Sequence, residues 1–363
     1  MYEQELQAIE RANRFRKREL YAEDLIDLAS NDYLGLAERR ELLDAAVRRT
    51  EAYRYHAPRA SQLVNGYHPI HAEFEALLCR INGFEKGIVV GSGFLANLSL
   101  IEALPRKRDL LVLDASYHAS GVMASRLVDA KVRFFRHNDP ESLDAILSQE
   151  RYRRAIVAVE GIYSMEGDLL DRAIFDVADR HEALLIVDEA HSSGVVGKHL
   201  SGVFEHYGIT PAANHIKMGT LGKAMGSYGA YILASEEIIA FLQNRAKAII
   251  YATAPSVIDT ALATEALHYL QSHAPTLRAA LETRRALASD FWDRAVASPI
   301  LRLPVADSQA ALRYRQFAKA QGYLIGAIRP PTVPSAILRI ILRANVPIEQ
   351  ISALFEQLKE QGV

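Results

Sequence analysis

The sequence has one cysteine and no long apolar run. Because Cys79 is the only cysteine among 363 residues, no intramolecular disulfide can form, and a disulfide-stabilised scaffold is excluded. No stretch approaches the ~20 consecutive apolar residues that cross a bilayer. Met1–Leu20 is strongly polar and lacks the apolar segment of a secretory signal. We therefore expect a cytoplasmic protein without a membrane partner.

Charge of one sign is not in excess either. The chain has 42 Lys and Arg against 44 Asp and Glu, a net charge of −2, so its electrostatics give no reason to expect a nucleic-acid partner. Hydrophobic residues make up 50% of the chain, and 20 Gly and 13 Pro are ordinary numbers, so wholesale disorder is excluded. At roughly 100–200 residues per domain, the length predicts two domains.

The middle of the chain alternates short apolar runs with longer amphipathic segments. This alternation predicts a largely parallel sheet covered by helices on both faces, in a large α/β domain at residues 65–250 after an N-terminal segment at 1–64. The expected strands are aliphatic runs bounded by Gly, Asp or Pro. They are Gly87–Val90, Asp109–Leu113, Lys131–Phe135, Ala155–Val159, Ala183–Val187, His215–Met218 and Tyr228–Leu233.

The last third of the chain has a different pattern. A long helical pattern covers about 255–296, and a final amphipathic helix is expected at Pro347–Gln361. Between them lie three strand-like pieces, at Ile300–Pro304, Gly322–Ile328 and Ile337–Leu342. We expect a smaller α+β domain at residues 251–363.

A lysine lies between glycines in the segment Thr220-Leu221-Gly222-Lys223-Ala224-Met225-Gly226. Glycine permits tight turns, so Lys223 can approach a ligand, and a lysine of lowered pKa is the nucleophile of imine-forming enzymes. The segment is not a phosphate-binding P-loop, because Ala224 follows Lys223. A surface lysine in a flexible turn would give the same pattern.

The apolar run Leu184–Val187 ends in Asp188, and His191 follows three residues later. Ligands of open α/β sheets bind at the carboxyl ends of strands, which places both side chains well. A buried carboxylate stays ionised only with a cationic partner or several hydrogen bonds, and a protonated pyridine nitrogen would be such a partner. A helix cap, a metal pair and a core histidine remain alternatives, although the helical H-E-x-x-H metal pattern is absent. We expect no metal.

Three further loops follow predicted strands. Gly91-Ser92-Gly93-Phe94 opens a helix, whose N-terminal N–H groups suit a phosphate, although this turn alone also fits a dinucleotide-binding enzyme. His118 and the segment Glu160–Asp168 follow two other strands, and each of them taken alone reads as an ordinary loop.

Together these motifs resemble the α-oxoamine synthases, which are pyridoxal-phosphate enzymes of the aspartate-aminotransferase fold (fold type I) that join an amino acid to an acyl thioester and release CO2. The resemblance extends from about Leu25 to Ala344. Its markers are Asn31-Asp32-Tyr33-Leu34-Gly35, Gly91-Ser92-Gly93-Phe94, Tyr117-His118, Glu160-Gly161-Ile162-Tyr163-Ser164-Met165-Glu166-Gly167-Asp168, Asp188-Glu189-Ala190-His191 and Thr220-Leu221-Gly222-Lys223.

The resemblance implies a role for each matched residue. Lys223 would form the imine with the cofactor and act as a base, and Asp188 would pair with the pyridinium nitrogen. His118 would stack on the ring, His191 and Ser164 would bind the phenolic oxygen, and Gly93, Phe94 and Thr220 would hold the phosphate. Substrate contacts are implied for Arg16, Asn31, Tyr251, Thr332 and Arg339, with Arg339 binding the amino acid's carboxylate. Without the resemblance, the sequence would predict that Arg339 is a solvent-facing charge and that the run Arg11–Arg18 is a solvated helical face.

Within the family, Ala327–Pro334 most resembles the biotin-pathway branch, which uses L-alanine and a pimeloyl thioester. The segment Ala60–Gly66 departs from the family, with Ala60 and Gln62 at positions that are often Gly and Arg. The resemblance also implies a homodimer with its sites at the interface. The alternatives are a glycine and acetyl-CoA enzyme of the same family, a non-catalytic pyridoxal-phosphate carrier, and an oxidoreductase, which would leave Lys223 and Asp188 without roles.

Overall fold

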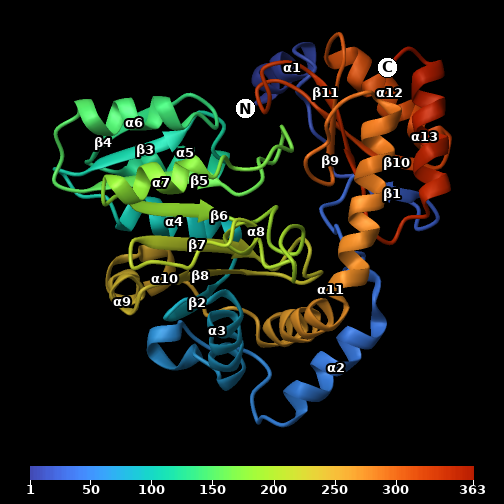
Figure 1. The fold of residues 1–363 in the computed structure, drawn as a ribbon. Coiled ribbons are helices and arrows are strands. Elements are labelled where there is room, and N and C mark those ends of the chain that lie inside the picture. The colour runs from blue at the N-terminus through green and yellow to red at the C-terminus, as the bar shows by residue number, and fades with distance from the viewer. The chain divides into compact units, whose positions relative to one another are not determined.

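A computed structural model describes residues 1–363, and the chain divides into two compact units (Figure 1). The large unit comprises Leu34–Ser164 and Asp168–Ala279, and the small unit comprises Met1–Tyr33, Met165–Gly167 and Ala280–Val363. These limits differ from those of the predicted domains at 65–250 and 251–363. The large unit is longer at both ends because Ala46, far upstream, packs with Ile70, Val257 and Ala261 in one buried cluster.

The large unit is built on a seven-stranded sheet in the order β2-β8-β7-β6-β5-β3-β4. From β7 to β4 all neighbours are parallel, whereas β8 is antiparallel to both β7 and β2. The predicted mostly parallel sheet is confirmed, and all seven predicted strands form. Their bounds are β2 Lys86–Val90, β3 Leu110–Asp114, β4 Lys131–Phe135, β5 Ala155–Glu160, β6 Leu184–Asp188, β7 His215–Thr220 and β8 Ala230–Ala234.

Helices alternate with these strands, and side-chain caps define where several of them begin. Ser92, Asp139 and Ser235 each accept a backbone N–H of the first turn of the helix that follows. The helices are α2 Arg40–Glu51, α3 Pro69–Asn82, α4 Gly93–Ala103, α5 Ala119–Ala124, α6 Pro140–Gln149, α7 Ala173–Arg180, α8 Val203–His206, α9 Glu236–Arg245 and α10 Lys247–Ile250. Short helical turns are η1 Leu36–Glu38, η2 Gln62–Gly66 and η3 Ser125–Leu127.

The small unit contains a four-stranded sheet in the order β1-β10-β11-β9. Its strands are β1 Ile26–Leu28, β9 Ile300–Pro304, β10 Tyr323–Ile328 and β11 Ile337–Ile341, and its helices are α1 Glu3–Arg11, α12 Ser308–Ala320 and α13 Ile348–Glu360. The N-terminal strand β1 pairs in parallel with β10, with Ile26 opposite Tyr323. Helix α11, Val257–Phe291, is 35 residues long and contributes residues to both units.

The N-terminal helix is shorter than the basic run suggests. Helix α1 ends at Arg11, and Asn13 follows with a left-handed φ of 53°, which stops helical hydrogen bonding. The interpretation of Arg11–Arg18 as a helical face is therefore wrong. No helix of the chain has both the length and the apolar character needed to cross a membrane.

Candidate active site

The large unit gathers polar residues at one edge of its sheet. Asp114, Glu160, Asp188 and Thr220 are the last residues of β3, β5, β6 and β7. The strands are parallel, and Glu160 lies in register with Asp188. The carboxyl ends of parallel strands meet at the same edge, so this edge is the expected place for a ligand in an open α/β sheet.

Asp188 is buried, with 4% of its surface exposed, and it receives only neutral donors. Asn97 Nδ2 donates to one carboxylate oxygen over 2.8 Å, and the backbone N–H of Ala190 donates to the other over 3.0 Å. Asp188 forms no ion pair with a basic side chain of the chain. A buried carboxylate in this state is stabilised by a cation supplied from outside, so its surroundings fit a protonated ring nitrogen.

Asn97 is held in one orientation by a buried network that the sequence analysis did not identify. The hydroxyl of Tyr117 donates to Asn97 Oδ1 over 2.6 Å, so the amide nitrogen must point to Asp188 and to Ser120 Oγ, which lies 3.0 Å away. Ser120 Oγ in turn lies 2.7 Å from His118 Nδ1. The signal available in the sequence was a polar residue, Asn97, flanked by apolar residues in a mostly apolar helix.

His118 belongs to this network and also interacts electrostatically with Lys223. Burial lowers the pKa of His118, the charge of Asp188 opposes this effect, and the cation of Lys223 adds to it. The ring is therefore neutral near pH 7. A neutral, partly buried imidazole fixed through Nδ1 offers a flat face to an aromatic ligand, as the stacking role predicted for His118 requires.

Lys223 lies in the loop between β7 and β8, and its Nζ is 2.8 Å from His191 Nε2. The loop is closed by Leu221 N–H, which donates to the carbonyl of Gly229 over 2.9 Å. Gly226 has a φ of +57°, and a Cβ there would lie 2.5 Å from the backbone nitrogen of Ala37, so the turn requires glycine. The loop therefore presents the lysine in a defined place beside an imidazole.

Ser164 and Thr220 are the remaining polar residues predicted at this edge. The backbone N–H of Ser164 donates to the Glu160 carboxylate over 3.1 Å, which fixes the start of its loop. Thr220 lies beside the first turn of α4. A Cβ atom placed on Gly93 would have the side chain of Thr220 as its nearest neighbour, with Oγ1 at 3.9 Å. The N–H groups of Gly93 and Phe94 lie at the N-terminus of α4, and such donors, aided by the helix dipole, suit a phosphate.

The remaining predicted residues divide between the units. In the small unit, Arg16 Nη2 donates to Thr332 Oγ1 over 3.1 Å, which joins two predicted substrate contacts 316 positions apart. Arg339 is buried in the middle of β11, opposite Arg302 of β9, and is therefore not a solvent-facing charge. Tyr251, in the large unit, is 80% exposed.

Asn31 lies in the turn after β1, and Arg343 fixes that turn. The guanidinium of Arg343 donates to the carboxylate of Asp32 over 2.9 Å through Nη2 and to its carbonyl over 2.9 Å through Nε. Arg343 is 3% exposed and also pairs with Asp27. Sequence reasoning missed this residue, although two aspartates close to Asn31 in the sequence indicated a need for a cation.

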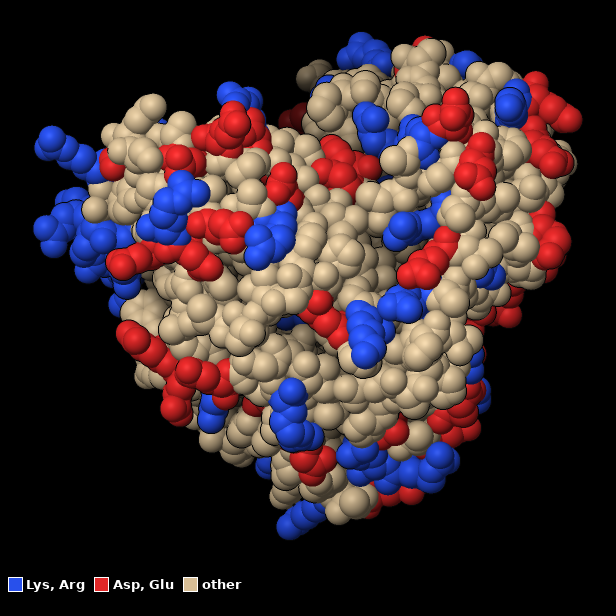
Figure 2. All heavy atoms as spheres, viewed as in Figure 1, with Lys and Arg blue, Asp and Glu red and all other residues tan.

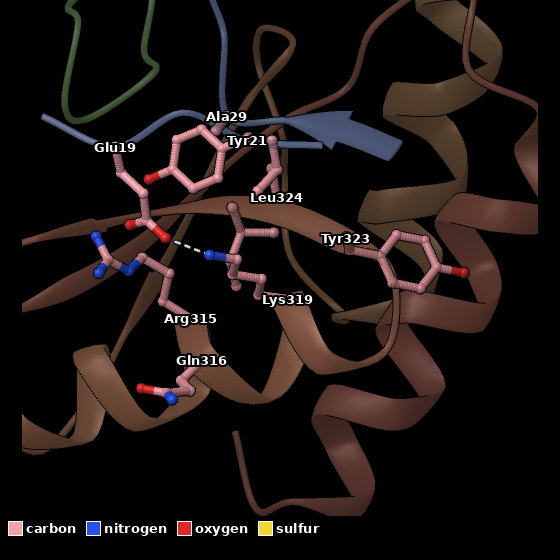
Figure 3. A pocket seen from close by; sticks show the side chains of 9 residues that line it. Glu19, Tyr21, Ala29, Arg315, Gln316, Lys319, Tyr323 and Leu324 are labelled. Atoms are coloured by element: carbon pink, nitrogen blue, oxygen red, sulfur yellow. Dashed lines mark hydrogen bonds and ion pairs between the residues drawn. The ribbon is translucent and has the colours of Figure 1, made fainter. Parts of the chain in front are cut away.

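The small unit also contains a cavity of about 180 Å³, shown in Figure 3. Glu19 forms an ion pair there with Lys319, whose ammonium lies over the ring of Tyr21, and Arg315 lies beside them. The lining includes no lysine close to a histidine and no buried unpaired carboxylate, so the cavity does not match the chemistry gathered around Asp188.

Comparisons with known proteins agree over nearly the whole chain. The family model described as aminotransferase class I and II matches residues 23–358. An 8-amino-7-oxononanoate synthase of Helicobacter pylori is 40% identical over 360 residues, which are 99% of this chain and 96% of the relative. A serine palmitoyltransferase variant from S. paucimobilis, with a bound PLP–myriocin aldimine, has a TM-score of 0.89 at 25% identity and covers 98% of this chain and 95% of its own. An 8-amino-7-oxononanoate synthase from Francisella tularensis has a TM-score of 0.78 at 26% identity, and the match covers 94% of this chain and 100% of the other.

Proposed function

Because the chain belongs to the class I and II aminotransferase family, we propose that it is a pyridoxal-phosphate-dependent acyltransferase that condenses L-alanine with a pimeloyl thioester. The products are 8-amino-7-oxononanoate, CO2 and the free thiol, a step of biotin biosynthesis. The observation that carries the proposal is the buried Asp188 carboxylate, which has only neutral donors and needs a cation. The names of the relatives support the choice of substrates.

The residues around Asp188 fit the cofactor. When bound, pyridoxal phosphate supplies an electron sink that stabilises negative charge at the amino acid's Cα. Asp188 would keep the ring nitrogen protonated, and the cradle formed by Gly93, Phe94 and Thr220 would bind the phosphate. Lys223 would hold the aldehyde carbon and later move a proton at Cα, with His191 orienting its amine.

The substrates would use residues of the small unit. Arg339 is a buried guanidinium whose two-pronged donor geometry matches a carboxylate, so we assign it to the α-carboxylate of alanine, assisted by Asn31. The pair Arg16 and Thr332 would contact the acyl chain, and Tyr251 would serve the site of a second copy. A homodimer is supported by the exposed apolar side chains of η2 and of Tyr251 in the large unit. We also propose a cytoplasmic location, since the one cysteine is free.

Thiol release from pimeloyl-CoA, measured with L-alanine, glycine or L-serine, tests the reaction and its specificity together. L-Alanine should give the highest kcat/KM. Glycine with acetyl-CoA as the preferred pair would contradict the substrate assignment while leaving the reaction class intact.

Replacing the lysine tests the role of Lys223. Lys223→Ala should lower turnover at least ~1,000-fold, because the group that holds the aldehyde and moves the proton is lost. The variant should still bind some cofactor but should not become labelled by borohydride in its presence. Lys198→Ala, at an exposed lysine of the same unit, is the matched control and should behave as the wild type. Wild-type turnover by Lys223→Ala would refute the mechanism.

A further inference from the structure

The opposite edge of the large sheet carries a group of arginines that the proposed reaction does not use. Arg106, Arg153, Arg154 and Arg245, which we call the arginine cluster, line a cavity of about 310 Å³ together with Phe241. In Figure 2, blue side chains gather at the left, where the parallel strands of Figure 1 begin. Strand β5 starts directly after Arg154 and ends at Glu160. Its six residues, at about 3.3 Å each, separate the cluster from the candidate active site by roughly 20 Å.

The cluster is held in place by one buried carboxylate. The side chain of Asp109 is fully buried and accepts hydrogen bonds from Arg153 Nε over 3.0 Å and from Arg154 Nη2 over 2.8 Å. Its loop is fixed by further bonds, since the backbone N–H of Arg106 donates to Asp109 Oδ2 over 3.0 Å. The guanidinium groups of Arg153 and Arg154 are therefore oriented, yet about half of each side chain remains exposed to solvent.

The charge of the cluster is not balanced. The guanidinium groups of Arg106 and Arg245 have no acidic or carbonyl partner in the chain, and Asp109 is the only carboxylate bonded to the cluster. Within the lining of this cavity, four cations are offset by one carboxylate, which leaves an excess of positive charge there. Guanidinium groups bind phosphate oxygens in pairs, so this arrangement suits a ligand with more than one phosphate.

A second cavity, lined by apolar side chains and by carboxylates, adjoins the charged one. It measures about 470 Å³ and shares Arg154 and Phe241 with the first cavity. Leu104, Leu184 and Ile238 line it, and the carboxylates of Glu85, Glu182 and Glu237 stand at its wall. Phe241 is 36% exposed and offers a ring for stacking. An inorganic polyphosphate would leave this half of the surface unused, whereas a flat ring with a hydroxylated sugar would fill it.

We propose that the two cavities together bind a nucleoside polyphosphate, with its phosphates on the arginine cluster and its base against Phe241. The carboxylates of the second cavity then accept hydrogen bonds from ribose hydroxyls or from an exocyclic amine. The ligand is either a free nucleotide or the nucleotide end of coenzyme A, since both present the same chemistry. The proposal does not depend on the reaction at the other edge.

Calorimetric titration of the full-length protein tests the site. ATP should bind at least ~10-fold more tightly than tripolyphosphate and ~50-fold more tightly than adenosine, because each of these lacks half of the contacts. The double variant Arg106→Ala/Arg245→Ala should weaken ATP binding at least ~20-fold without disturbing Asp109. Phe241→Ala should reduce the affinity for ATP to that for tripolyphosphate. Arg172→Ala, an exposed arginine paired with Asp176 on α7, is the control and should change nothing.

Coenzyme A distinguishes the two sources of the ligand. Binding as tight as that of ATP, with the same loss in the double variant, identifies the nucleotide end of coenzyme A as a ligand of this second site, and much weaker binding identifies a free nucleotide. The proposal is overturned if ATP does not bind at millimolar concentration, or if tripolyphosphate binds as tightly as ATP. It is equally overturned if the double variant binds ATP as the wild type does.

Discussion

The negative charge of Asp188 has one neutral amide and one backbone N–H to compensate for it. Asp188→Asn keeps the shape of the side chain and removes the charge that holds a ring nitrogen in its protonated form. A hydrogen bond to a charged group contributes about 1.5–3 kcal/mol, so the dissociation constant of pyridoxal phosphate should rise ~10–100-fold, and thiol release should fall at least as much. Equilibrium titration with the cofactor and the thiol assay measure the two effects. Asp176→Asn, at an exposed aspartate, is the control, and unchanged cofactor affinity of Asp188→Asn would contradict the assignment.

Asn97 acts through Asp188 and is a positioning residue. Asn97→Ala removes the donor to Asp188 and leaves the buried hydroxyl of Tyr117 without its acceptor. We expect kcat to fall ~10-fold or more with little change in the KM for alanine, and the unfolding free energy to fall by about 1–3 kcal/mol. Tyr117→Phe removes the hydroxyl itself and should cost less in both measurements. A purely structural role would lower stability and leave kcat unchanged.

The turn between β4 and α6 joins the end of β3 to the loop that follows β5. His137 Nδ1 lies 3.0 Å from Asp114 at the end of β3, and Nε2 lies 3.1 Å from Asp168. Burial lowers the pKa of His137, but the hydrogen bonds and charges of the two aspartates outweigh it and raise the pKa to about 10. The imidazolium therefore joins two carboxylates, and Tyr163 donates to the second oxygen of Asp114 over 2.8 Å.

Replacing His137 should reveal how much the imidazolium stabilises the fold, because this stabilisation depends on pH. Because the pKa in the folded state is above the usual 6.5, the stabilisation is fully present below about pH 6.5 and is lost as the pH rises through about 10. His137→Ala should lower the unfolding free energy by about 2 kcal/mol at pH 7, and the difference from the wild type should shrink near pH 10.5. Urea titration of both proteins at the two pH values measures the difference in unfolding free energy. His199→Ala, at an exposed histidine, is the control, and a pH-independent difference for His137→Ala would contradict the interpretation.

The sequence predicted those elements that carry their own pattern. Six of the seven strands of the large sheet are almost wholly buried, and β4 is a partly exposed edge strand, yet each contains aliphatic or aromatic residues and was identifiable. The family match over residues 23–358 confirms the resemblance and the fold type. Strand β1 was missed because three residues carry no period and its neighbour β10 lies almost 300 positions away. The bonds of Asn97 with Tyr117, and of Arg343 with Asp32, are likewise set by tertiary packing, which no local pattern encodes.

At the scale of the whole molecule, the proposed dimer can be tested at the exposed apolar surface formed by η2 and Tyr251. Val64 of η2 is 77% exposed, and the bridge between Ser61 and Thr253 brings η2 close to the exposed Tyr251. Val64→Glu adds a charge to this apolar surface and should shift the protein from dimer to monomer at micromolar concentration. Sedimentation velocity measures the change, and cofactor retention should fall with it if the second copy completes the site.

Phe134→Glu is the matched control for this experiment. Phe134 is 49% exposed on β4, at the edge of the sheet opposite to β2, and Gln62 of η2 bonds to β2 through the carbonyl of Val89. The two sites therefore test different surfaces of the same unit. A dimer that persists in Val64→Glu but dissociates in Phe134→Glu would place the interface elsewhere.

The parallel pairing of β1 with β10 also has a consequence during synthesis on the ribosome. Strand β1 leaves the exit tunnel first, but it cannot form its backbone hydrogen bonds until β10 has been translated almost 300 codons later. The seven-stranded sheet is complete once Ala234 has emerged, so it can fold while the N-terminal strand is still unpaired. Nascent chains stalled shortly after Ala279 should therefore have a protease-resistant sheet and a cleavable N-terminus, and only release of the finished polypeptide should protect both.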